Sequence, residues 1–217
     1  MKKILTTAIL CAGLVGFTAC DSFLDEDPKS SLTLDTYYKT SADIIGNVNY
    51  LYRDGAPDKM GNMTGAYRGS SLSVMNMVTG YFVNEYEGQE VDCSYARQLT
   101  RQDFTQSCCN YLTNDTWKSC YKSINVANAV IKYVDGVEMD NQAQYKAEAR
   151  FFRALNYFYL VKMFGDVPMV TEPTEDATLV EYPTRTAASE VFNTVIIPDL
   201  QFAVENLPNA TFAGNSH

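Results

Sequence analysis

The stretch Gln142–Val170, QAQYKAEARFFRALNYFYLVKMFGDVPMV, decides how the chain folds. Its apolar residues recur at steps of three and four, the spacing that puts side chains on one face of an α-helix. One such face carries Ala147, Phe151, Ala154, Leu155, Phe158 and Val161, and a neighbouring face carries Phe152, Leu155, Tyr159 and Met163. A helix that is apolar on two faces packs against partners on both, so the sequence predicts an inner helix.

The ends of this helix are marked by capping signals. Asn141 and Gln144 have the spacing of a capping box at the start, and Lys162 complements the helix dipole in the last turn. Gly165 and Pro168 predict the end of the helix, because glycine accepts a left-handed backbone and proline cannot continue a helix.

Within this stretch, Glu148–Val170 resembles the hallmark helix of the SusD/RagB family, surface lipoproteins that capture nutrients for outer-membrane transporters. The family pattern runs from an acidic residue through two arginines, an aromatic run and Leu-Val to the turn FGDVP, and this segment contains every part. An ordinary amphipathic core helix would explain the periodicity but not that terminal turn. The resemblance implies an all-α fold, a tetratricopeptide-like helical-repeat scaffold with long irregular loops.

Residues 1–19 are predicted to form a signal peptide, with Lys2 and Lys3 ahead of an apolar run and Ala19 directly before Cys20. A cysteine in this place becomes the acylated first residue of a lipoprotein, whose acyl chains hold it on a membrane without a span. Phe17 departs from the usual Leu or Val of such a cleavage site. Ordinary secretion with cleavage near Ala19 is therefore the alternative.

Residues 20–35 are predicted to be the lipid anchor and an acidic tether. The segment DSFLDEDPKSSLT resembles the family's opening, in which acidic residues such as Asp25, Glu26 and Asp27 mark lipoproteins for the cell surface. A solvated, flexible tether would use the same residues. Residues 36–217 are then the SusD-like N-terminal helical domain. Family members are usually much longer, so the C-terminal part of the family fold is expected to be missing.

The composition fits a folded, acidic domain. The chain is 46% hydrophobic and 20% charged with a formal net charge of −9, and removal of Lys2 and Lys3 leaves 15 basic against 26 acidic residues. A chain without a basic patch cannot displace counterions from phosphates, which argues against nucleic acid as a partner. The same charge argues against electrostatic adhesion to anionic lipid.

Two further helices are predicted ahead of the hallmark helix. Ser41 caps one that ends at Asp54-Gly55, and Asn114 or Asp115 caps another that ends at Asp135-Gly136. Ile44, Ile45, Val48, Leu51 and Tyr52 share a face of the first, and Trp117, Tyr121, Ile124, Asn128 and Ile131 share a face of the second. A short loop joins the second to the hallmark helix, so the two are expected to be antiparallel neighbours.

The second of these helices, WKSCYKSINVANAVIKYVD, also resembles a family helix. At its helical spacing Trp117 is predicted to lie in the core rather than to stack on a sugar. Between the two helices, the chain from Gly55 to Thr113 shows no sustained period, and a helix across Leu72–Val83 is the one element predicted there.

The C-terminal part begins with a polar linker, Glu172–Pro183, and continues with a segment that resembles another family helix, TRTAASEVFNTVIIPDLQFAVENLP. Pro198 predicts a kink or break near Val195. The apolar residues of this helix are expected to form an exposed strip where the next repeat would pack: Val191, Val195, Ile196, Leu200, Val204 and Leu207. The chain is accordingly expected to self-associate or to need a partner for solubility.

Catalytic and metal-binding patterns are not found in the sequence. The one histidine is His217. No motif of a catalytic nucleophile, a zinc site or a phosphate-binding loop occurs in the sequence surroundings that such a motif requires. A glycosidase-type carboxylate pair is the alternative. We expect no cofactor, no metal and no enzymatic activity.

Four cysteines remain after the leader and the anchor are set aside: Cys93, Cys108, Cys109 and Cys120. Export permits disulfides. A bond from Cys108 or Cys109 to Cys93 or Cys120 is favoured over a strained bridge between the adjacent pair, and buried thiols are the equal alternative.

Ligand-binding residues are predicted from the family resemblance, because glycan-binding relatives use aromatic rings flanked by polar side chains. In those relatives the N-terminal share of the site lies before the helix that contains Trp117. In this chain the region supplies Tyr67, Arg68, Tyr81, Asn84, Tyr86 and Tyr95, nominated by type and place. The alternative is that these tyrosines serve loop packing and surface hydrogen bonds.

The resemblance implies a nutrient-binding lipoprotein on the exterior of the outer membrane. It would take up an oligosaccharide or a peptide and deliver it to a SusC-like TonB-dependent transporter. The first alternative is a helical-repeat interaction module that docks on the transporter and binds no ligand. The second is a surface glycosidase, which the missing motifs disfavour.

Overall fold

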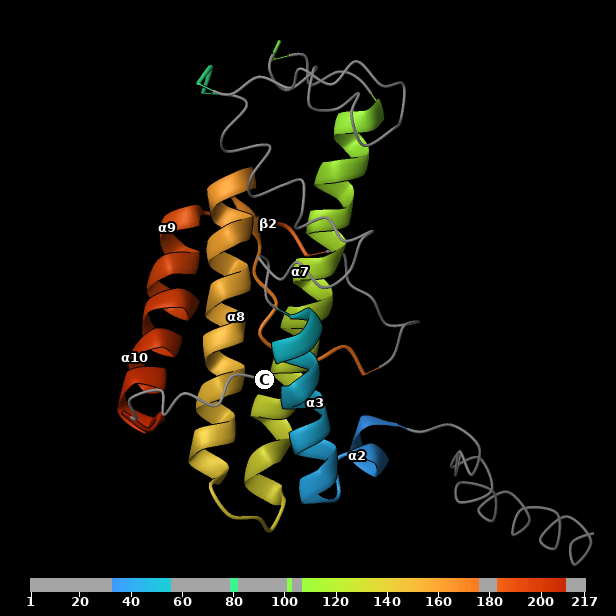
Figure 1. Cartoon of the computed structure of the whole chain (residues 1–217), viewed down its shortest axis with the longest axis vertical. Coiled ribbons are helices and arrows are strands. Elements are labelled where there is room, and N and C mark those ends of the chain that lie inside the picture. The colour runs from blue at the N-terminus through green and yellow to red at the C-terminus, as the bar shows by residue number, and fades with distance from the viewer. Residues whose placement is uncertain (1–32, 56–78, 82–100, 103–106, 176–182, 210–217) are drawn as a thin grey trace, which may run out of the picture. The chain divides into compact units, whose positions relative to one another are not determined.

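The computed structural model of the chain describes residues 33–55, 79–81, 101–102, 107–175 and 183–209 (Figure 1). Everything described from Leu34 onward belongs to one compact unit. Its helices are α2 (Leu34–Tyr37), α3 (Ser41–Asp54), α7 (Ser107–Tyr133), α8 (Gln142–Phe164), α9 (Ala188–Val191) and α10 (Ile197–Asn206). A 3₁₀ turn, η2 (Val134–Gly136), follows α7, and a π-helical segment, η4 (Phe192–Ile196), joins α9 to α10.

Strand structure among the described residues is limited to β1 (Val167–Pro168) and β2 (Arg185–Thr186), which pair antiparallel. The expectation of a helical fold is confirmed. The predicted division of the chain into a signal peptide (residues 1–19), an anchor with its tether (20–35) and a helical domain (36–217) stays a prediction.

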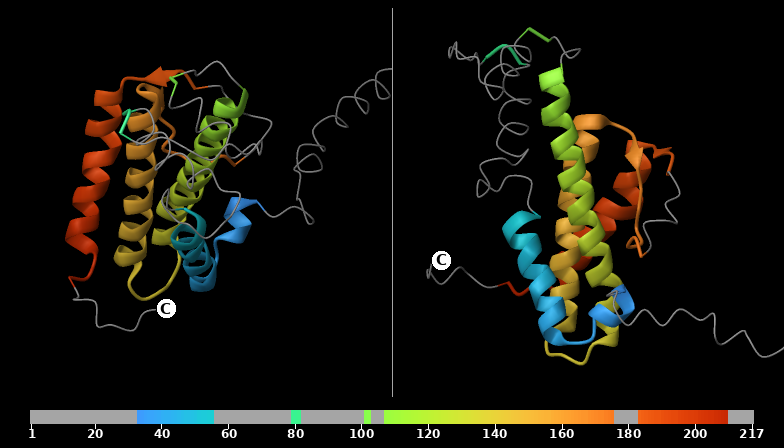
Figure 2. Two further views of the ribbon diagram at one scale, coloured as in Figure 1. Left: turned by 45° about the horizontal axis from the view of Figure 1, so that its top comes forward. Right: turned by 90° about the vertical axis from the view of Figure 1, so that its right-hand side faces the viewer.

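Helix α8 is the inner helix of the unit. It packs against α7, α10, α3 and η4 (Figure 1, Figure 2). A short turn through η2 connects α7 to α8, and the two helices run antiparallel side by side. The predicted inner helix and the predicted antiparallel pair are both confirmed.

The face of α8 that points inward differs from the predicted one. Ala147, Ala154 and Val161 are buried as expected, but Phe151 and Phe158 keep 37% and 39% of their surface exposed. The prediction was wrong for these two phenylalanines because polar side chains occupy part of the buried face. The buried residues of α8 are Ala147, Glu148, Ala149, Phe152, Arg153, Ala154, Asn156, Tyr157, Leu160 and Val161.

The predicted capping box of α8 is wrong. Asn141 has a left-handed backbone with φ 59° and makes no side-chain cap bond, and the Gln144 amide donates to Glu148 instead. The Gln142 amide donates to the carbonyls of Val134 and Val137, which ties the start of α8 to the preceding turn. At the other end the prediction is confirmed: α8 ends at Phe164, and Gly165 takes φ 69°, which glycine tolerates.

Helix α3 is capped one residue earlier than predicted. Thr40 is the N-cap, and its backbone N–H donates to the Asp43 carboxylate at 2.8 Å, while Ser41 is the first helical residue. At the C-terminal end Gly55 is needed for space, because a Cβ there would come within 2.7 Å of the Leu51 Cα. Tyr52 is 52% exposed and so lies outside the buried face assigned to it.

Helix α7 begins at Ser107, well before the predicted caps at Asn114 and Asp115. Within the helix predicted across Leu72–Val83, Thr79 and Gly80 form a turn, and residues 72–78 and 82–83 lie outside the described part of the chain. Trp117 is partly buried and packs on Tyr121 and Phe164, with ring centroids 4.9 and 5.1 Å apart, so the core assignment is confirmed.

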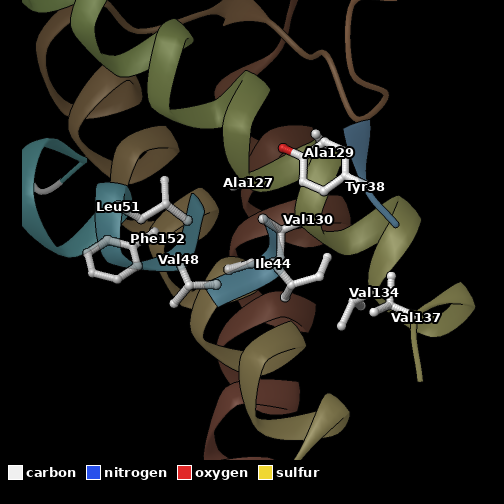
Figure 3. Packing of buried hydrophobic residues seen from close by; sticks show 11 residues of the cluster. Tyr38, Ile44, Val48, Leu51, Ala127, Ala129, Val130, Val134, Val137 and Phe152 are labelled. Atoms are coloured by element: carbon white, nitrogen blue, oxygen red, sulfur yellow. The ribbon is translucent and has the colours of Figure 1, made fainter. Parts of the chain in front are cut away.

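Buried hydrophobic residues gather in two clusters along α7 and α8. The first joins α3 to both helices through Ile44, Val48, Val130 and Phe152, with Tyr38 beside them (Figure 3). The second cluster holds α8 against α7, β1, α9 and η4, and its buried members are Cys120, Ile124, Ala154, Tyr157, Leu160, Val161, Val167, Val191, Val195 and Ile196.

The C-terminal helix contains the irregularity that Pro198 predicts. Instead of a break, the five residues of η4 form a π-helical segment, and the Ile197 N–H bonds to the Phe192 carbonyl. A proline has no N–H and crowds the carbonyl four residues earlier, so a widened turn just before Pro198 accommodates it.

The predicted exposed strip on this helix is wrong for three of its residues. Val191, Val195 and Ile196 are buried in the second cluster. Leu200 and Val204 are exposed as predicted, at 39% and 83%, and Ile197 joins them at 44%.

The facing of α8 gives a direct test. Leu160→Ala should lower the free energy of unfolding by about 2–5 kcal/mol, because Leu160 is fully buried. Phe158→Ala should cost clearly less, although it removes more atoms, because the Phe158 ring is 39% exposed. Urea unfolding of both variants measures the difference, and equal losses would contradict the facing described above.

Candidate functional site

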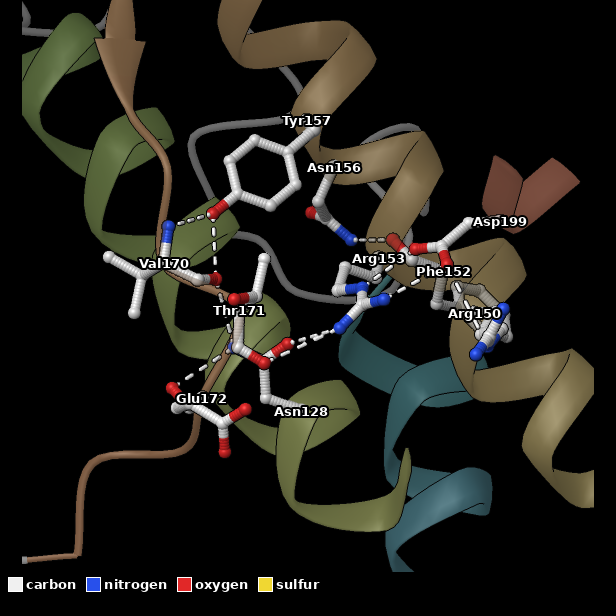
Figure 4. A network of polar contacts seen from close by, with 10 residues as sticks. All are labelled: Asn128, Arg150, Phe152, Arg153, Asn156, Tyr157, Val170, Thr171, Glu172 and Asp199. Carbon is white, nitrogen blue, oxygen red and sulfur yellow. Dashed lines mark hydrogen bonds and ion pairs between the residues drawn. The ribbon is translucent and has the colours of Figure 1, made fainter. Parts of the chain in front are cut away.

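A buried ion pair joins the middle of α8 to α10. The Arg153 Nε donates to Asp199 Oδ2 at 2.7 Å, and Nη2 donates to Oδ1 at 2.9 Å (Figure 4). Arg153 and Asp199 are 8% and 2% exposed. This bidentate arrangement fixes both the distance and the relative rotation of the two helices, because a guanidinium and a carboxylate meet edge to edge in one plane.

The same guanidinium reaches α7 and the chain that follows β1. Its Nη1 donates to Asn128 Oδ1 at 2.9 Å and to the Thr171 carbonyl at 3.5 Å. The Asn128 amide in turn donates to the carbonyls of Val170 and Glu172 at 3.0 and 3.2 Å. One arginine therefore connects α7, α8, α10 and the segment after β1.

Tyr157, one turn after Arg153, holds that segment from the other side. Its hydroxyl donates to the Val170 carbonyl at 2.8 Å and accepts from the Val170 N–H at 2.7 Å. Burial raises the pKa of Tyr157 to about 12, so the hydroxyl keeps its proton at neutral pH and remains a donor. Tyr121 of α7 adds a further bond, donating to the Pro168 carbonyl at 2.7 Å.

Asn156 attaches the end of α3 to α8. Its amide donates to the Gly55 carbonyl at 2.7 Å and to the Phe152 carbonyl at 2.8 Å. Arg150 lies on the α10 side, with Nε 3.8 Å from Asp199 Oδ1 and its guanidinium 4.2 Å from the centre of the Phe202 ring. The contact with the ring is a cation–π interaction, which stabilises a partly desolvated arginine.

This buried network acts as a scaffold. Arg153, Asn128 and Tyr157 bond to one another's elements and to backbone carbonyls, whereas Asn156 Oδ1 and Arg150 Nε are buried without a hydrogen-bond partner. The network lies along α8 between Phe152 of the first hydrophobic cluster and Tyr157 of the second. The arrangement aligns helices. Among the described residues, no group of three or more His, Cys, Asp or Glu is placed to hold a metal ion.

Sequence reasoning missed this network although its residues belong to the segments that carry the family resemblance. Arg153, Asn156 and Tyr157 lie in FFRALNY, Asn128 in INVAN, and Asp199 directly follows Pro198. The available signal was the spacing of Arg153 and Asn156, which share helical positions with Ala149 and Leu160 on the inward side of α8.

The residues nominated for ligand binding lie mostly outside the described part of the chain. Tyr81 is described, and it lies in the turn Thr79–Tyr81 with 88% of its surface exposed. Tyr67, Arg68, Asn84, Tyr86 and Tyr95 lie outside the described residues, and so does the proposed lipidation site, Cys20. The ligand site therefore stays a prediction.

The cysteine pairing likewise stays a prediction. Cys120 is fully buried in the second hydrophobic cluster. Cys93 and the side chains of Cys108 and Cys109 lie outside what the structure describes. In the described part of the chain no helix is both long enough and apolar enough to cross a membrane.

The ion pair predicts a strong energetic coupling. Arg153→Met or Asp199→Leu alone should lower the free energy of unfolding by about 3–5 kcal/mol, because each leaves an uncompensated buried charge. The double variant should cost less than the sum of the two by more than about 1.5 kcal/mol. Urea unfolding provides the values.

A matched cycle on the Lys146–Asp135 pair serves as the control, because the Asp135 side chain is 65% exposed and surface pairs couple by only about 0.2–1 kcal/mol. If the losses of unfolding free energy at Arg153 and Asp199 were additive, the stabilising role given to the Arg153–Asp199 ion pair would be contradicted.

Comparison with known proteins places this geometry in a family. The family model SusD-like_3, described as "Starch-binding associating with outer membrane", matches residues 22–215. A SusD-like protein of Formosa agariphila is 29% identical over 216 residues, and a SusD-like protein of Bacteroides ovatus is 28% identical over 221 residues. Each alignment covers 98% of this chain, but only 40% and 36% of the respective relative.

Solved structures agree on the fold. A SusD superfamily protein from Parabacteroides distasonis superposes with a TM-score of 0.60 at 24% identity, covering 79% of this chain and 35% of that protein. A surface glycan-binding protein A from Bacteroides fluxus gives a TM-score of 0.58 at 20% identity, covering 82% and 36%. The predicted tetratricopeptide-like helical scaffold is confirmed by this likeness. With the family model matching nearly its whole length, the chain belongs to the SusD-like family.

Proposed function

We propose that this chain is part of a glycan-binding lipoprotein of the outer membrane. The observation that carries the proposal is the family match over residues 22–215, since the family's description combines starch binding with the outer membrane. One solved neighbour, with a TM-score of 0.57, is a crystal structure with a xylogluco-oligosaccharide, and another is a surface glycan-binding protein. The chain spans about 40% or less of the length of the curated relatives it matches, so we infer that it supplies part of the ligand site.

The helices support this function as a rigid base. The nominated ligand residues belong to the connection from Gly55 to Ser107, which starts at the end of α3 and returns at the start of α7. Asn156 of α8 bonds the Gly55 carbonyl, and α7 is fixed to α8 through Asn128 and Arg153. The Gly55 end of the connection is therefore anchored to α8, and the other end continues into a helix whose middle is bonded to the same α8.

The proposed chemistry is recognition without bond cleavage. Tyrosine rings offer an apolar face to the C–H groups of a sugar and a hydroxyl for hydrogen bonds, while Arg68 and Asn84 add donors and an acceptor. Delivery of the bound glycan to a SusC-like TonB-dependent transporter completes the proposal. The alternative is a helical-repeat module that docks on the transporter and binds no ligand.

Glycan binding is tested with the protein expressed from Asp21 onward. We expect immobilised protein to retain maltooligosaccharides or xylogluco-oligosaccharides and to release them uncleaved. Tyr81→Ala should weaken retention by about tenfold, or about 1.4 kcal/mol, without unfolding the protein, because Tyr81 is 88% exposed. Tyr37→Ala, which removes an exposed tyrosine that is not nominated, is the control and should leave retention unchanged.

Each other result of this experiment points elsewhere. Failure to retain any glycan of the panel would contradict the proposal and favour the interaction module. Release of shorter saccharides would identify a glycosidase.

The anchor is tested by cell fractionation. Cys20→Ala should move the protein from the membrane fraction to the soluble fraction, because the acyl chains are its proposed attachment. Cys11→Ala, a cysteine of the leader, should leave the protein on the membrane. A Cys20→Ala variant that stays with the membrane would contradict lipid anchoring.

A further inference from the structure

Four cysteines follow Cys20, and three of them lie on one helix. Cys108, Cys109 and Cys120 all belong to α7, which runs without interruption from Ser107 to Tyr133. The fourth, Cys93, belongs to the connection that returns to the start of α7, and it lies outside the described residues. The geometry of one helix therefore decides which of these cysteines are able to form a disulfide.

Bonds from Cys120 to the other cysteines of α7 are excluded by distance. A disulfide needs two Cα atoms within about 7 Å of each other. Cys120 lies 11 residues after Cys109 and 12 residues after Cys108. Because an α-helix rises about 1.5 Å per residue, these Cα atoms are about 16–18 Å apart. The bond from Cys108 or Cys109 to Cys120 that the sequence leaves open is therefore excluded.

The adjacent cysteines cannot close on each other either. Cys108 and Cys109 are consecutive residues of a helix, in which successive positions are about 100° apart around the axis and successive Cα atoms are about 3.8 Å apart. A disulfide spans a Cα separation of about 4.4–6.8 Å. Among the four cysteines, Cys93 is therefore the one partner that remains for any cysteine of α7.

Burial favours the start of α7 over Cys120 as the place of the bond. Cys120 is 0% exposed and lies in the second hydrophobic cluster, together with Ile124, Ala154 and Leu160. The thiolate is the form that reacts in disulfide exchange, and apolar surroundings disfavour it, so a cysteine buried in this way is inert.

The start of α7, by contrast, extends beyond the contact of α7 with the end of α8. Trp117 packs on Phe164, the last residue of α8, and α7 begins ten residues before Trp117 (Figure 2). At the rise of a helix, about 15 Å of α7 lies past this contact. Cys108 and Cys109 belong to that part of α7, at the end where the connection with Cys93 joins it.

We propose that a disulfide joins Cys93 to Cys108 or Cys109 and ties the last part of the connection to the start of α7. The loop that it closes contains Tyr95, one of the residues nominated for ligand binding. The inference rests on the proposed outer-membrane location, because exported proteins meet the oxidising conditions in which disulfides persist.

Formation of the bond needs an oxidant, which is a disulfide of the glutathione class. The two cysteine thiols lose two protons and two electrons as the new sulfur–sulfur bond forms. Oxidised glutathione takes them up in two exchange steps through a mixed disulfide, and it leaves as two molecules of reduced glutathione.

The test is peptide mapping of the folded protein expressed from Asp21 onward. The protein is treated with oxidised glutathione, its remaining thiols are alkylated in denaturant, and it is digested with trypsin without reduction. Cleavage after lysine and arginine places Cys93 in peptide 69–97, Cys108 and Cys109 in peptide 102–118, and Cys120 in peptide 119–122. We expect mass spectrometry to find peptide 69–97 linked to peptide 102–118, and dithiothreitol to separate them.

Two variants provide the controls. Cys93→Ser should remove the linked pair of peptides, whereas Cys120→Ala should leave its yield unchanged, and circular dichroism checks that both variants are folded. The proposal is overturned by a link from peptide 69–97 to peptide 119–122, by a bridge within peptide 102–118, by a link between two copies of the protein, or by recovery of every peptide unlinked. The mapping uses no glycan, so a failure of this inference is distinguishable from a failure of glycan binding.

Discussion

The bidentate contact between Arg153 and Asp199 is the constraint on which the rest of the fold depends. A buried guanidinium is costly unless its donors are used, and here they are met by Asp199, by Asn128 and by the Thr171 carbonyl. Those partners come from α10, α7 and the chain after β1. The requirement to satisfy one arginine therefore specifies where three other parts of the chain lie, more narrowly than the hydrophobic clusters could, since apolar contacts are not directional.

Much of this fold could be predicted from the sequence, because the helices carry strong periodic and terminal signals. The inner position of α8, its end at Gly165, its pairing with α7 and the irregularity before Pro198 all follow from such signals. The exact inward face of α8 could not be predicted, because Arg153 and Asn156 belong to it and polar residues count as solvent-facing in an apolar pattern. Phe151 and Phe158 were assigned inward for the same reason.

The functional residues were harder to predict than the fold. A scaffold residue such as Asn128 is specified by partners far along the chain, at Val170 and Glu172, which no local pattern contains. The family motif did mark these residues, and the structure gives the physical reason: FFRALNY and the asparagine of INVAN build the network of polar contacts around α8. Residues nominated for ligand binding, such as Tyr86, have no such signal, because tyrosines between helices are equally suited to packing and to binding.

The Arg153–Asp199 contact also determines which side of α10 points away from α8. With Asp199 fixed toward α8, the rotation of α10 about its own axis is set. At 3.6 residues per turn, the position two residues before Asp199 and the position five residues after it lie on roughly the opposite side of the helix. These positions are Ile197 and Val204, with Leu200 beside them. A rotation that turned this side of α10 toward α8 would break the bidentate contact and leave Arg153 buried without its carboxylate. The direction in which Ile197, Leu200 and Val204 point is thus a consequence of the buried ion pair.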